Sequence, residues 1–255
     1  MKMVCGSFYL SKDRRDWPVE GEDAHFICAE ENTIGVADGV GGCRKHGIDS
    51  GVYARKLMNN AVTAVHNQHR ISGDSNVDPR KVLNEAYANT KDVEGLSTAC
   101  IVALNNRDGK LHAVNVGDSG FMFFRNNKFM YKSPIQQHGF NCPFNLGRNA
   151  ENGPQSAEEI KPVEVIPGDV IVLGTDGLLD NVWPEEIEQV LEENTVVEPE
   201  LLAWIIAEQL ALRNSEDVNR FSPYSIASYK AGKERIGGKV DDITVIVGHI
   251  IAAQQ

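Results

Sequence analysis

The sequence predicts an α+β fold whose strands are buried on both faces. In Val170-Ile-Val-Leu173 and Ile243-Thr-Val-Ile-Val247 apolar side chains fall on both faces of the predicted strand. Such strands need cover on two sides, from a second sheet on one and from helices on the other. Helical apolar spacing over Ala54–Val65 supplies one such cover. No repeat, low-complexity tract or linker divides the chain, so we expect a single domain over residues 1–255.

Seven runs rich in Val, Ile and Phe are predicted as strands, because turn residues such as Asn32 and Asp108-Gly109 bound them. They are Ala24–Ala29, Thr33–Ala37, Thr98–Leu104, Leu111–Val116, Phe121–Arg125, Val170–Thr175 and Ile243–Ile251.

Four helices are predicted from their N-terminal signals, which are capping side chains, prolines in the first turn and acids near the positive end of the dipole. One contains Ala54–Val65 and begins at Asp49 or Ser50, and the others begin at Asp78-Pro79, Pro184 and Pro199. Two long segments, Ser133–Pro162 and Asn214–Lys239, are poor in strand signals. Insertions of that length in a compact domain are typical of functional flaps.

Composition excludes several classes of function. The 36 acidic and 25 basic residues give a formal charge of −11, which argues against nucleic acid as a partner. No apolar stretch is long enough to span a membrane, and the sequence after Met1 does not resemble a signal peptide. Five scattered cysteines without a Cys-x-x-Cys pair indicate free thiols in a reducing, intracellular compartment.

Aspartates stand where apolar strands meet turns, and two of them, Asp38 and Asp176, are followed by glycine. Asp38 ends one predicted strand, Asp118 another and Asp176 a third, with Asp180 shortly after it, while Asp241 precedes the last. For any one of them ordinary turn chemistry is the simpler interpretation. Together with Glu22-Asp23 they favour a cation site, because clustered carboxylates repel one another unless a cation neutralises them. Oxygen ligands alone indicate Mg²⁺ or Mn²⁺ rather than zinc.

The motifs that contain these acids resemble, in order and rough spacing, the type 2C family of metal-dependent protein serine/threonine phosphatases. They are Gly21-Glu22-Asp23-Ala24-His25, Val36-Ala-Asp38-Gly39-Val-Gly-Gly42, Ser97-Thr98-Ala99, Gly117-Asp118-Ser119, Thr175-Asp176-Gly177-Leu-Leu-Asp180 and Asp241-Asp-Ile-Thr-Val-Ile-Val247. The resemblance implies a four-layer α-β-β-α sandwich with two central antiparallel sheets. The Asp-Gly-Val-Gly-Gly form, with Gln136-Gln137-His138 and Cys142-Pro143-Phe144, is similar to the branch often found in mitochondria and plastids.

The resemblance also implies a ligand set for two Mn²⁺ or Mg²⁺ ions and a weaker third. Asp38 would bridge two ions, Glu22 and the Gly39 carbonyl would complete one site, and Asp176 and Asp241 the other. Asp118 and Asp180, with Asp176, match the third site. A hydroxide that bridges the metals would attack the phosphorus of phosphoserine or phosphothreonine in a protein substrate, with Asp38, Asp176 and Asp241 as the catalytic residues. No organic cofactor is expected, and the chain is expected to be a monomer.

The chain departs from the family pattern at two positions. Many relatives have histidine, a proposed general acid, where this chain has Val40, and arginine, a phosphate ligand, where it has Pro18. Arg14 and Arg15 lie upstream as candidate substitutes. These departures leave an alternative open, a catalytically impaired phosphatase-like binding module. A haloacid dehalogenase phosphatase is rejected, because that class needs an aspartate where Gly174 stands.

Overall fold

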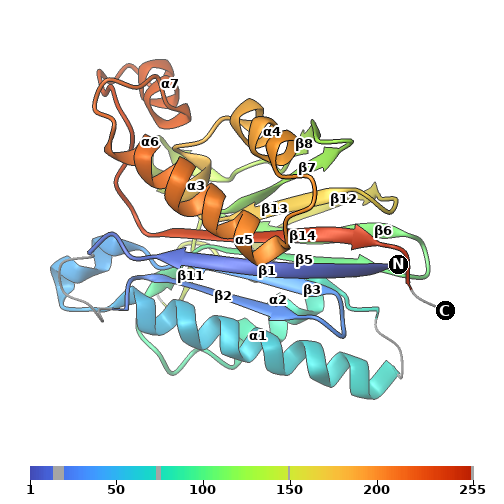
Figure 1. Cartoon of the computed structure of the whole chain (residues 1–255). Helices are drawn as coiled ribbons and strands as arrows, with labels where there is room; N and C mark the ends of the chain where they lie inside the picture. Colours follow the sequence, from blue (N-terminus) through green and yellow to red (C-terminus); the bar gives the residue numbers. More distant parts are fainter. Residues whose placement is uncertain (14–19, 73–75, 149, 254–255) are drawn as a thin grey trace.

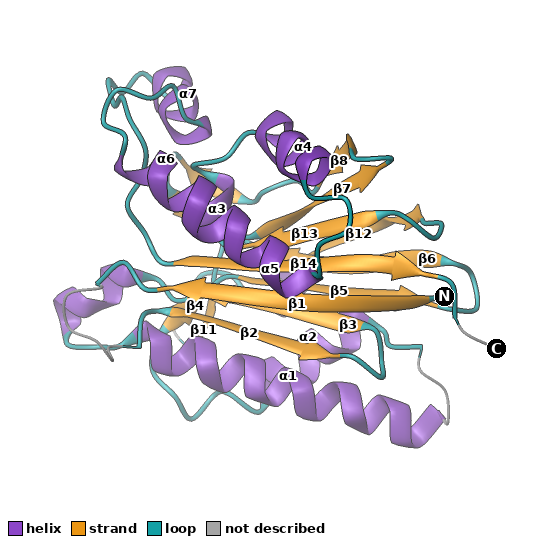
Figure 2. Cartoon of the chain, in the orientation of Figure 1, coloured by secondary structure: helices purple, strands orange, loops and turns teal. Residues whose placement is uncertain are grey.

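Two five-stranded antiparallel sheets form the centre of the molecule (Figures 1 and 2). The structure, a computed structural model, describes residues 1–13, 20–72, 76–148 and 150–253. One sheet has the strand order β1-β14-β13-β7-β8 and the other β12-β6-β5-β3-β2. The ten strands of the two sheets are β1 (Lys2–Leu10), β2 (Asp23–Cys28), β3 (Thr33–Asp38), β5 (Ala99–Asn105), β6 (Lys110–Val116), β7 (Gly120–Arg125), β8 (Lys128–Lys132), β12 (Glu158–Glu164), β13 (Val170–Gly174) and β14 (Ile243–Ile251).

Helices and short strands complete the fold. The helices are α1 (Ser50–Ser72), α2 (Pro79–Ala88), α3 (Asp176–Leu179), α4 (Pro184–Glu193), α5 (Pro199–Trp204), α6 (Arg213–Glu216) and α7 (Pro223–Lys230). The 3₁₀ segments η2 (Gly41–His46) and η3 (Pro154–Ser156) and the π-helical η4 (Ile205–Leu212) join them. Two small ladders pair β9 (Gln137–Gly139) with β10 (Cys142–Pro143) and β4 (Leu96–Ser97) with β11 (Leu146–Gly147).

Three buried apolar clusters follow from the alternation of side chains along the strands. In β5, Ile101 packs with residues of α1 and α2, whereas its neighbour Val102 packs against the other sheet. In β13, Val172 packs with residues of α3 to α5, whereas Ile171 joins the cluster that both sheets share. The central strands are therefore buried on both faces, as the sequence predicts.

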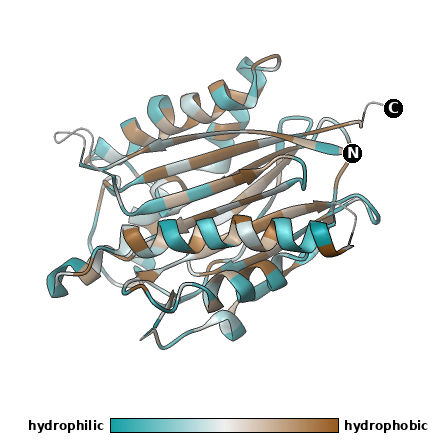
Figure 3. Ribbon diagram, turned by 90° about the horizontal axis from the view of Figure 1, so that it is seen from below, coloured by the Kyte–Doolittle hydropathy of each residue, from teal (hydrophilic) through white to brown (hydrophobic). Residues whose placement is uncertain are grey.

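The helices cover the outer faces of the two sheets. Helix α1 lies along the sheet that contains β2 and β3, and α4 and α5 lie over the other sheet (Figure 1). Figure 3 views the molecule from the α1 side, where hydrophilic positions alternate with apolar ones on the helix and the strands behind it are largely apolar. The Asp49 carboxylate accepts a hydrogen bond from the Gly51 N–H (2.9 Å), and Asp78 caps α2.

The predicted elements compare closely with the observed ones. All seven predicted strands are present, and each of their ends lies within one residue of the prediction. The sequence interpretation missed three long strands, β1, β8 and β12. The prediction that Ser133–Pro162 is poor in strands was wrong at its end, because β12 begins at Glu158, and β9 to β11 also lie within it.

Two structural observations concern the predictions made for the cysteines and for membrane spans. All five cysteines are free thiols, and three of them, Cys28, Cys43 and Cys100, are buried. No helix in the described parts of the chain is long and apolar enough to cross a bilayer.

Candidate metal centre

The predicted acids of the first sheet lie at one end of the β2–β3 hairpin. Asp38 is the last residue of β3 and stands opposite Asp23, the first residue of β2, in the antiparallel register. Glu22 directly precedes β2, and its carbonyl accepts a hydrogen bond from the Gly39 N–H at 3.0 Å. A Cβ on Gly39 would lie 2.7 Å from this carbonyl oxygen, so glycine permits the close approach of the two segments.

The second sheet brings its acids to the same end. Strand β13 ends at Gly174 and α3 begins at Asp176, while Asp241 and Asp242 directly precede β14, the neighbour of β13. At Gly177 a Cβ would lie 1.9 Å from the Asp242 carbonyl oxygen. Glycine therefore lets α3 pack directly on the start of β14, which places Asp176 beside Asp241.

A cleft of about 460 Å³ opens between these two groups of acids. Asp38, Asp176 and Asp241, the three predicted catalytic residues, line it together with Gly39. Glu22 and Asp180 contact Lys12 and Lys239, which line the cleft, and the charge of Asp176 acts on Asp118. Residues far apart in the sequence thus meet at one place.

Two lysines that the sequence interpretation did not identify lie between the carboxylates. Lys12 Nζ is 2.8 Å from Glu22 Oε2 and 2.9 Å from Asp241 Oδ1. Lys239 Nζ binds Asp176 Oδ2 and lies 3.2 Å from Asp180 Oδ2 and 3.3 Å from Asp241 Oδ2. For Lys239 a sequence signal exists, since it stands two residues before Asp241 and alternate residues of an extended chain face the same side.

The carboxylates of the cluster also repel one another. Burial and the charges of Asp176 and Asp23 raise the pKa of Asp38 well above its usual range. Burial and the charge of Asp176 raise the pKa of Asp118 to about 7 and that of Asp180 to about 6. Burial has the same tendency at Asp241, but the ammonium groups of Lys239 and Lys12 outweigh it and lower the pKa of Asp241.

Several buried carboxylate oxygens lack a hydrogen-bond donor, which suits a cation. Glu22 Oε1, Asp118 Oδ1 and Asp176 Oδ1 accept no hydrogen bond from any described residue. Arg44 Nε lies 3.0 Å from Glu22 Oε1 but is not aligned as a hydrogen-bond donor. Among the described residues, no three of these acids have ligand oxygens that all lie within 4.8 Å of one another. An all-oxygen donor set with unpaired buried oxygens fits Mn²⁺ or Mg²⁺.

Asp23 and Asp242, next to the acids of the cleft, accept hydrogen bonds from other parts of the chain. Asp23 Oδ2 accepts from the hydroxyls of Thr175 and Thr244, each at 2.7 Å. Asp242 accepts from the Glu22 N–H at 2.5 Å and from the Lys12 N–H at 2.7 Å. These contacts tie the two sheets together beneath the cleft.

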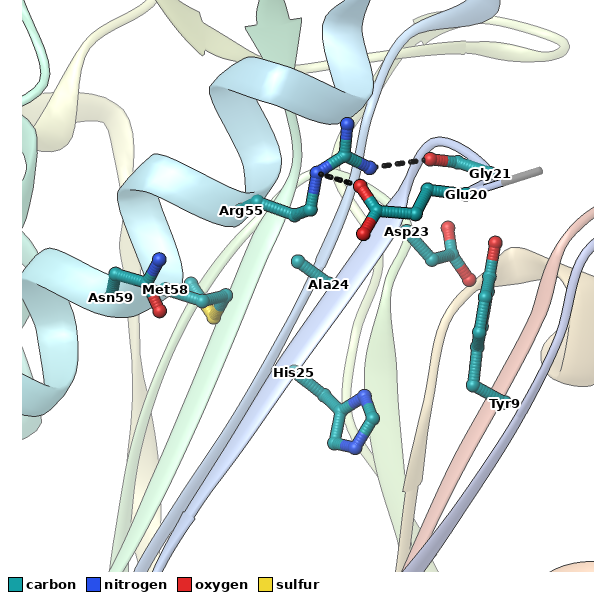
Figure 4. A pocket seen from close by; sticks show the side chains of 9 residues that line it. All are labelled: Tyr9, Glu20, Gly21, Asp23, Ala24, His25, Arg55, Met58 and Asn59. Atoms are coloured by element: carbon teal, nitrogen blue, oxygen red, sulfur yellow. Dashed lines mark hydrogen bonds and ion pairs between the residues drawn. The ribbon is translucent and has the colours of Figure 1, made fainter. Parts of the chain in front are cut away.

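Helix α1 also fixes the segment that contains Glu22 (Figure 4). Arg55 Nη1 donates to the Gly21 carbonyl at 2.7 Å, and its Nε lies 3.2 Å from a carboxylate oxygen of Glu20. Figure 4 shows a second pocket, distinct from the cleft, in which Asp23 lies beside Tyr9 and the His25 side chain lies further along β2. His25 Nε2 contacts Ser7 Oγ at 3.0 Å.

Of the two positions at which the chain departs from the family pattern, Val40 belongs to the described residues and Pro18 does not. Val40 lines the cleft directly after Asp38 and Gly39, and its N–H donates to the Leu96 carbonyl at 2.8 Å. Pro18, Arg14 and Arg15 lie outside the described residues.

A family model and several known proteins are similar to this chain. The family model of Stage II sporulation protein E matches residues 31–249. A probable protein phosphatase 2C 55 of Arabidopsis thaliana is 44% identical over 257 residues, which cover 100% of this chain and 53% of the relative. The chain thus spans about half the length of that relative. The protein phosphatase PTC7 homolog fig of Drosophila grimshawi is 37% identical over 256 residues, covering 92% of this chain and 81% of the relative.

Solved structures share the fold. The photosystem II phosphatase PBCP superimposes with a TM-score of 0.88 at 30% identity, over 98% of this chain and 100% of that one. The catalytic domain of the serine threonine protein phosphatase PstP, in complex with two manganese ions, superimposes with a TM-score of 0.65 at 19% identity, over 98% and 100% of the two chains.

Proposed function

Because this chain belongs to the protein phosphatase 2C family, we propose that it hydrolyses phosphoserine and phosphothreonine esters of proteins with the help of divalent metal ions. The observation that carries the proposal is the meeting of Asp38, Asp176 and Asp241 in one cleft beside unpaired buried oxygens. The sequence disfavours the alternative of a catalytically impaired binding module, because every acid of the predicted ligand set is present in the chain.

Two ions and a weaker third would be held by the predicted ligands. Glu22, Asp38 and the Gly39 carbonyl form the first set, and Asp38, Asp176 and Asp241 form the second. Asp118 and Asp180, with Asp176, form the third. When bound, Mn²⁺ or Mg²⁺ lowers the pKa of a coordinated water and offsets the charge of the phosphate. The two manganese ions in the PstP structure support this assignment by similarity of fold.

The chain's own residues supply the rest of the cleft. Lys12 and Lys45 line it and give positive charge to a region where a phosphate dianion would bind. They are therefore candidates for the role that an arginine at the position of Pro18 has in many relatives. Val40 offers no proton to the leaving seryl or threonyl oxygen, so that proton must come from elsewhere.

Several broader assignments belong to the same proposal. The two sheets with helices on their outer faces correspond to the four-layer α-β-β-α sandwich of the family, and residues 1–255 act as one catalytic domain. Phosphoproteins are the substrates, and the domain acts as a monomer. Similarity to the photosystem II phosphatase PBCP and to the plant relative supports a plastid, with a mitochondrion as the alternative organelle.

A metal-removal experiment tests the proposal. Hydrolysis of an aryl phosphate should require added Mn²⁺ or Mg²⁺ and cease in chelator, because oxygen-only sites release their ions readily. Addition of excess Mn²⁺ should restore the rate. Full turnover after verified removal of metal would contradict the mechanism.

A further inference from the structure

A second group of metal-ligating side chains lies at the opposite end of the β2–β3 hairpin from the acid cluster. The register pairs Asp23 with Asp38 at the cleft and Cys28 with Thr33 at the far end. The two ends are five residue steps apart along β2, or about 17 Å. Cys28, Glu31 and His66 meet at this far end, and none of them lines the cleft.

The geometry of this group is close to that of a tetrahedral metal site. One ligand atom of each side chain lies within 4.8 Å of the other two, and His66 Nε2 is 3.8 Å from Glu31 Oε1. Zinc–ligand bonds of 2.0–2.3 Å place neighbouring ligand atoms roughly 3.3–3.8 Å apart. In the described parts of the chain no other group of three His, Cys, Asp or Glu side chains has ligand atoms that all lie within 4.8 Å of one another.

Two of the three ligands stand on a fixed backbone. Glu31 belongs to the turn that joins β2 to β3, and its carbonyl accepts a hydrogen bond from the Thr33 hydroxyl at 2.9 Å. The next residue, Asn32, accepts from the Met3 N–H at 2.7 Å and from the Leu104 N–H at 3.0 Å. His66 projects from α1 and is 59% exposed, so its ring is free to adjust. Such a site has two preorganised ligands and one mobile ligand.

The charge of the group also favours a cation. The Glu31 side chain is only 8% exposed, and its ion-pair partner is His66, which is charged only when protonated. A divalent ion would release the Cys28 thiol proton, and its two positive charges would balance one thiolate and one carboxylate.

We propose that Cys28, Glu31 and His66 bind one Zn²⁺ ion that fastens α1 to the β2–β3 hairpin. Sulfur and nitrogen ligands select zinc over Mg²⁺ or Mn²⁺, which distinguishes this site from the oxygen-lined cleft. Three protein ligands leave a fourth position for water. Helix α1 would connect this ion to the region of the cleft. The helix runs about 24 Å from His66 to Ser50, and Arg55, near its Ser50 end, donates to the Gly21 carbonyl.

Metal titration of the full chain tests the site, with excess Mg²⁺ present to occupy the oxygen ligands of the cleft. Co²⁺ serves as the spectroscopic probe for Zn²⁺, because a Co²⁺–thiolate bond has a charge-transfer absorption that oxygen ligands do not produce. We expect this absorption in the wild type and in Cys142→Ser, a control at an exposed cysteine, and its loss in Cys28→Ser. Zn²⁺ should displace Co²⁺ stoichiometrically.

The exposed ligand gives a variant that should fold normally. His66→Ala should bind Zn²⁺ about a hundredfold more weakly or worse, since even partners behind a ligand contribute ten- to a hundredfold to affinity. Zn²⁺ should raise the melting temperature of the wild type but not of His66→Ala. Equal Zn²⁺ affinity in wild type and His66→Ala, or a charge-transfer absorption that persists in Cys28→Ser, would overturn the proposal. Neither result depends on phosphatase activity.

Discussion

The Asp38 carboxylate makes no hydrogen bond or ion pair with any described residue, although other carboxylates surround it. We expect Asp38→Asn and Asp176→Asn each to lower turnover about a hundredfold or more, because they remove the ligands that activate the nucleophile. The metal-free fold should persist, since Asp38→Asn removes a repelling charge and Lys239 keeps Asp180 and Asp241 as ion-pair partners in Asp176→Asn. Steady-state kinetics and thermal melting measure the two effects.

Asp108→Asn provides a matched control for these variants. Asp108 is outside the cleft, where its carboxylate contacts His112 at 2.8 Å. Its turnover should stay close to that of the wild type. Near-normal turnover in Asp38→Asn or Asp176→Asn would show that the metal centre lies elsewhere.

Val40 makes a second prediction at the residue scale. A seryl or threonyl alkoxide is a poor leaving group and gains from a positioned acid, an effect typically of about a hundredfold or more, whereas nitrophenolate gains little. We therefore expect Val40→His to raise turnover on phosphoserine peptides more than on nitrophenyl phosphate, with Mn²⁺ affinity unchanged. Equal changes on both substrates, or a loss only on the peptide, would refute the idea that an acid is missing.

At the scale of elements, the contact of α3 with β14 positions two predicted ligands at once. Gly177→Ala would drive a methyl group into the Asp242 carbonyl, so α3 must move away from β14. We expect a loss of about 1–3 kcal/mol in the free energy of unfolding, together with weaker Mn²⁺ binding. Denaturant unfolding and Mn²⁺ titration measure the two effects.

Gly139→Ala is the matched control for that variant. No heavy atom lies within 4 Å of a Cβ built at Gly139, and its φ is not positive. It should change neither quantity appreciably. Similar behaviour of the two alanine variants would mean that the α3–β14 contact does not position the ligands.

The three longer strands that the sequence did not reveal share a position in the two large sheets. Strands β1 and β8 are the two edges of one sheet, and β12 is an edge of the other. An edge strand packs fewer apolar side chains, so it tolerates charge and proline, as in Glu158–Glu164, and gives a weak apolar pattern. Central strands such as β13, buried on both faces, are apolar throughout and were predicted to within one residue.

The acids of the site were predictable for a related reason. Each stands beside a strand with a strong apolar pattern, so its place at a strand end is legible in the sequence. Lys12 was not, because its position follows from the pairing of β1 with β14, a contact between segments more than 200 residues apart. Single-sequence patterns contain no information on that pairing.

At the scale of the whole molecule, the acid cluster should make stability depend on both pH and metal. The raised pKa values of Asp118 and Asp180, about 7 and about 6, mean that the folded protein binds more protons than the unfolded chain between about pH 4 and pH 7. The stability of the metal-free protein should therefore fall as pH rises through this range. Since one pKa unit corresponds to about 1.4 kcal/mol, the decrease from these two groups should be on the order of 6 kcal/mol.

Thermal melting in chelator across this pH range measures the decrease, and a parallel series in Mn²⁺ is the comparison. Mn²⁺ should abolish most of the decrease, because it replaces protons as the neutralising charge. A metal-free melting temperature that rises from pH 4 to pH 7 would contradict the assigned pKa values.

The position of β14 has a consequence for how the protein is made. This strand lies between β1 and β13, and all nine residues of β1 pair with it. During synthesis β1 cannot pair with β14 until β14 has left the ribosome, more than 200 residues later. Pairing between segments so far apart in the sequence is slow. Asp241 and Asp242 emerge just before β14, so a nascent chain lacks both the middle of its sheet and part of its metal centre until the same late moment. The chain would then become catalytically active only after β14 has been synthesised and has paired with β1 and β13.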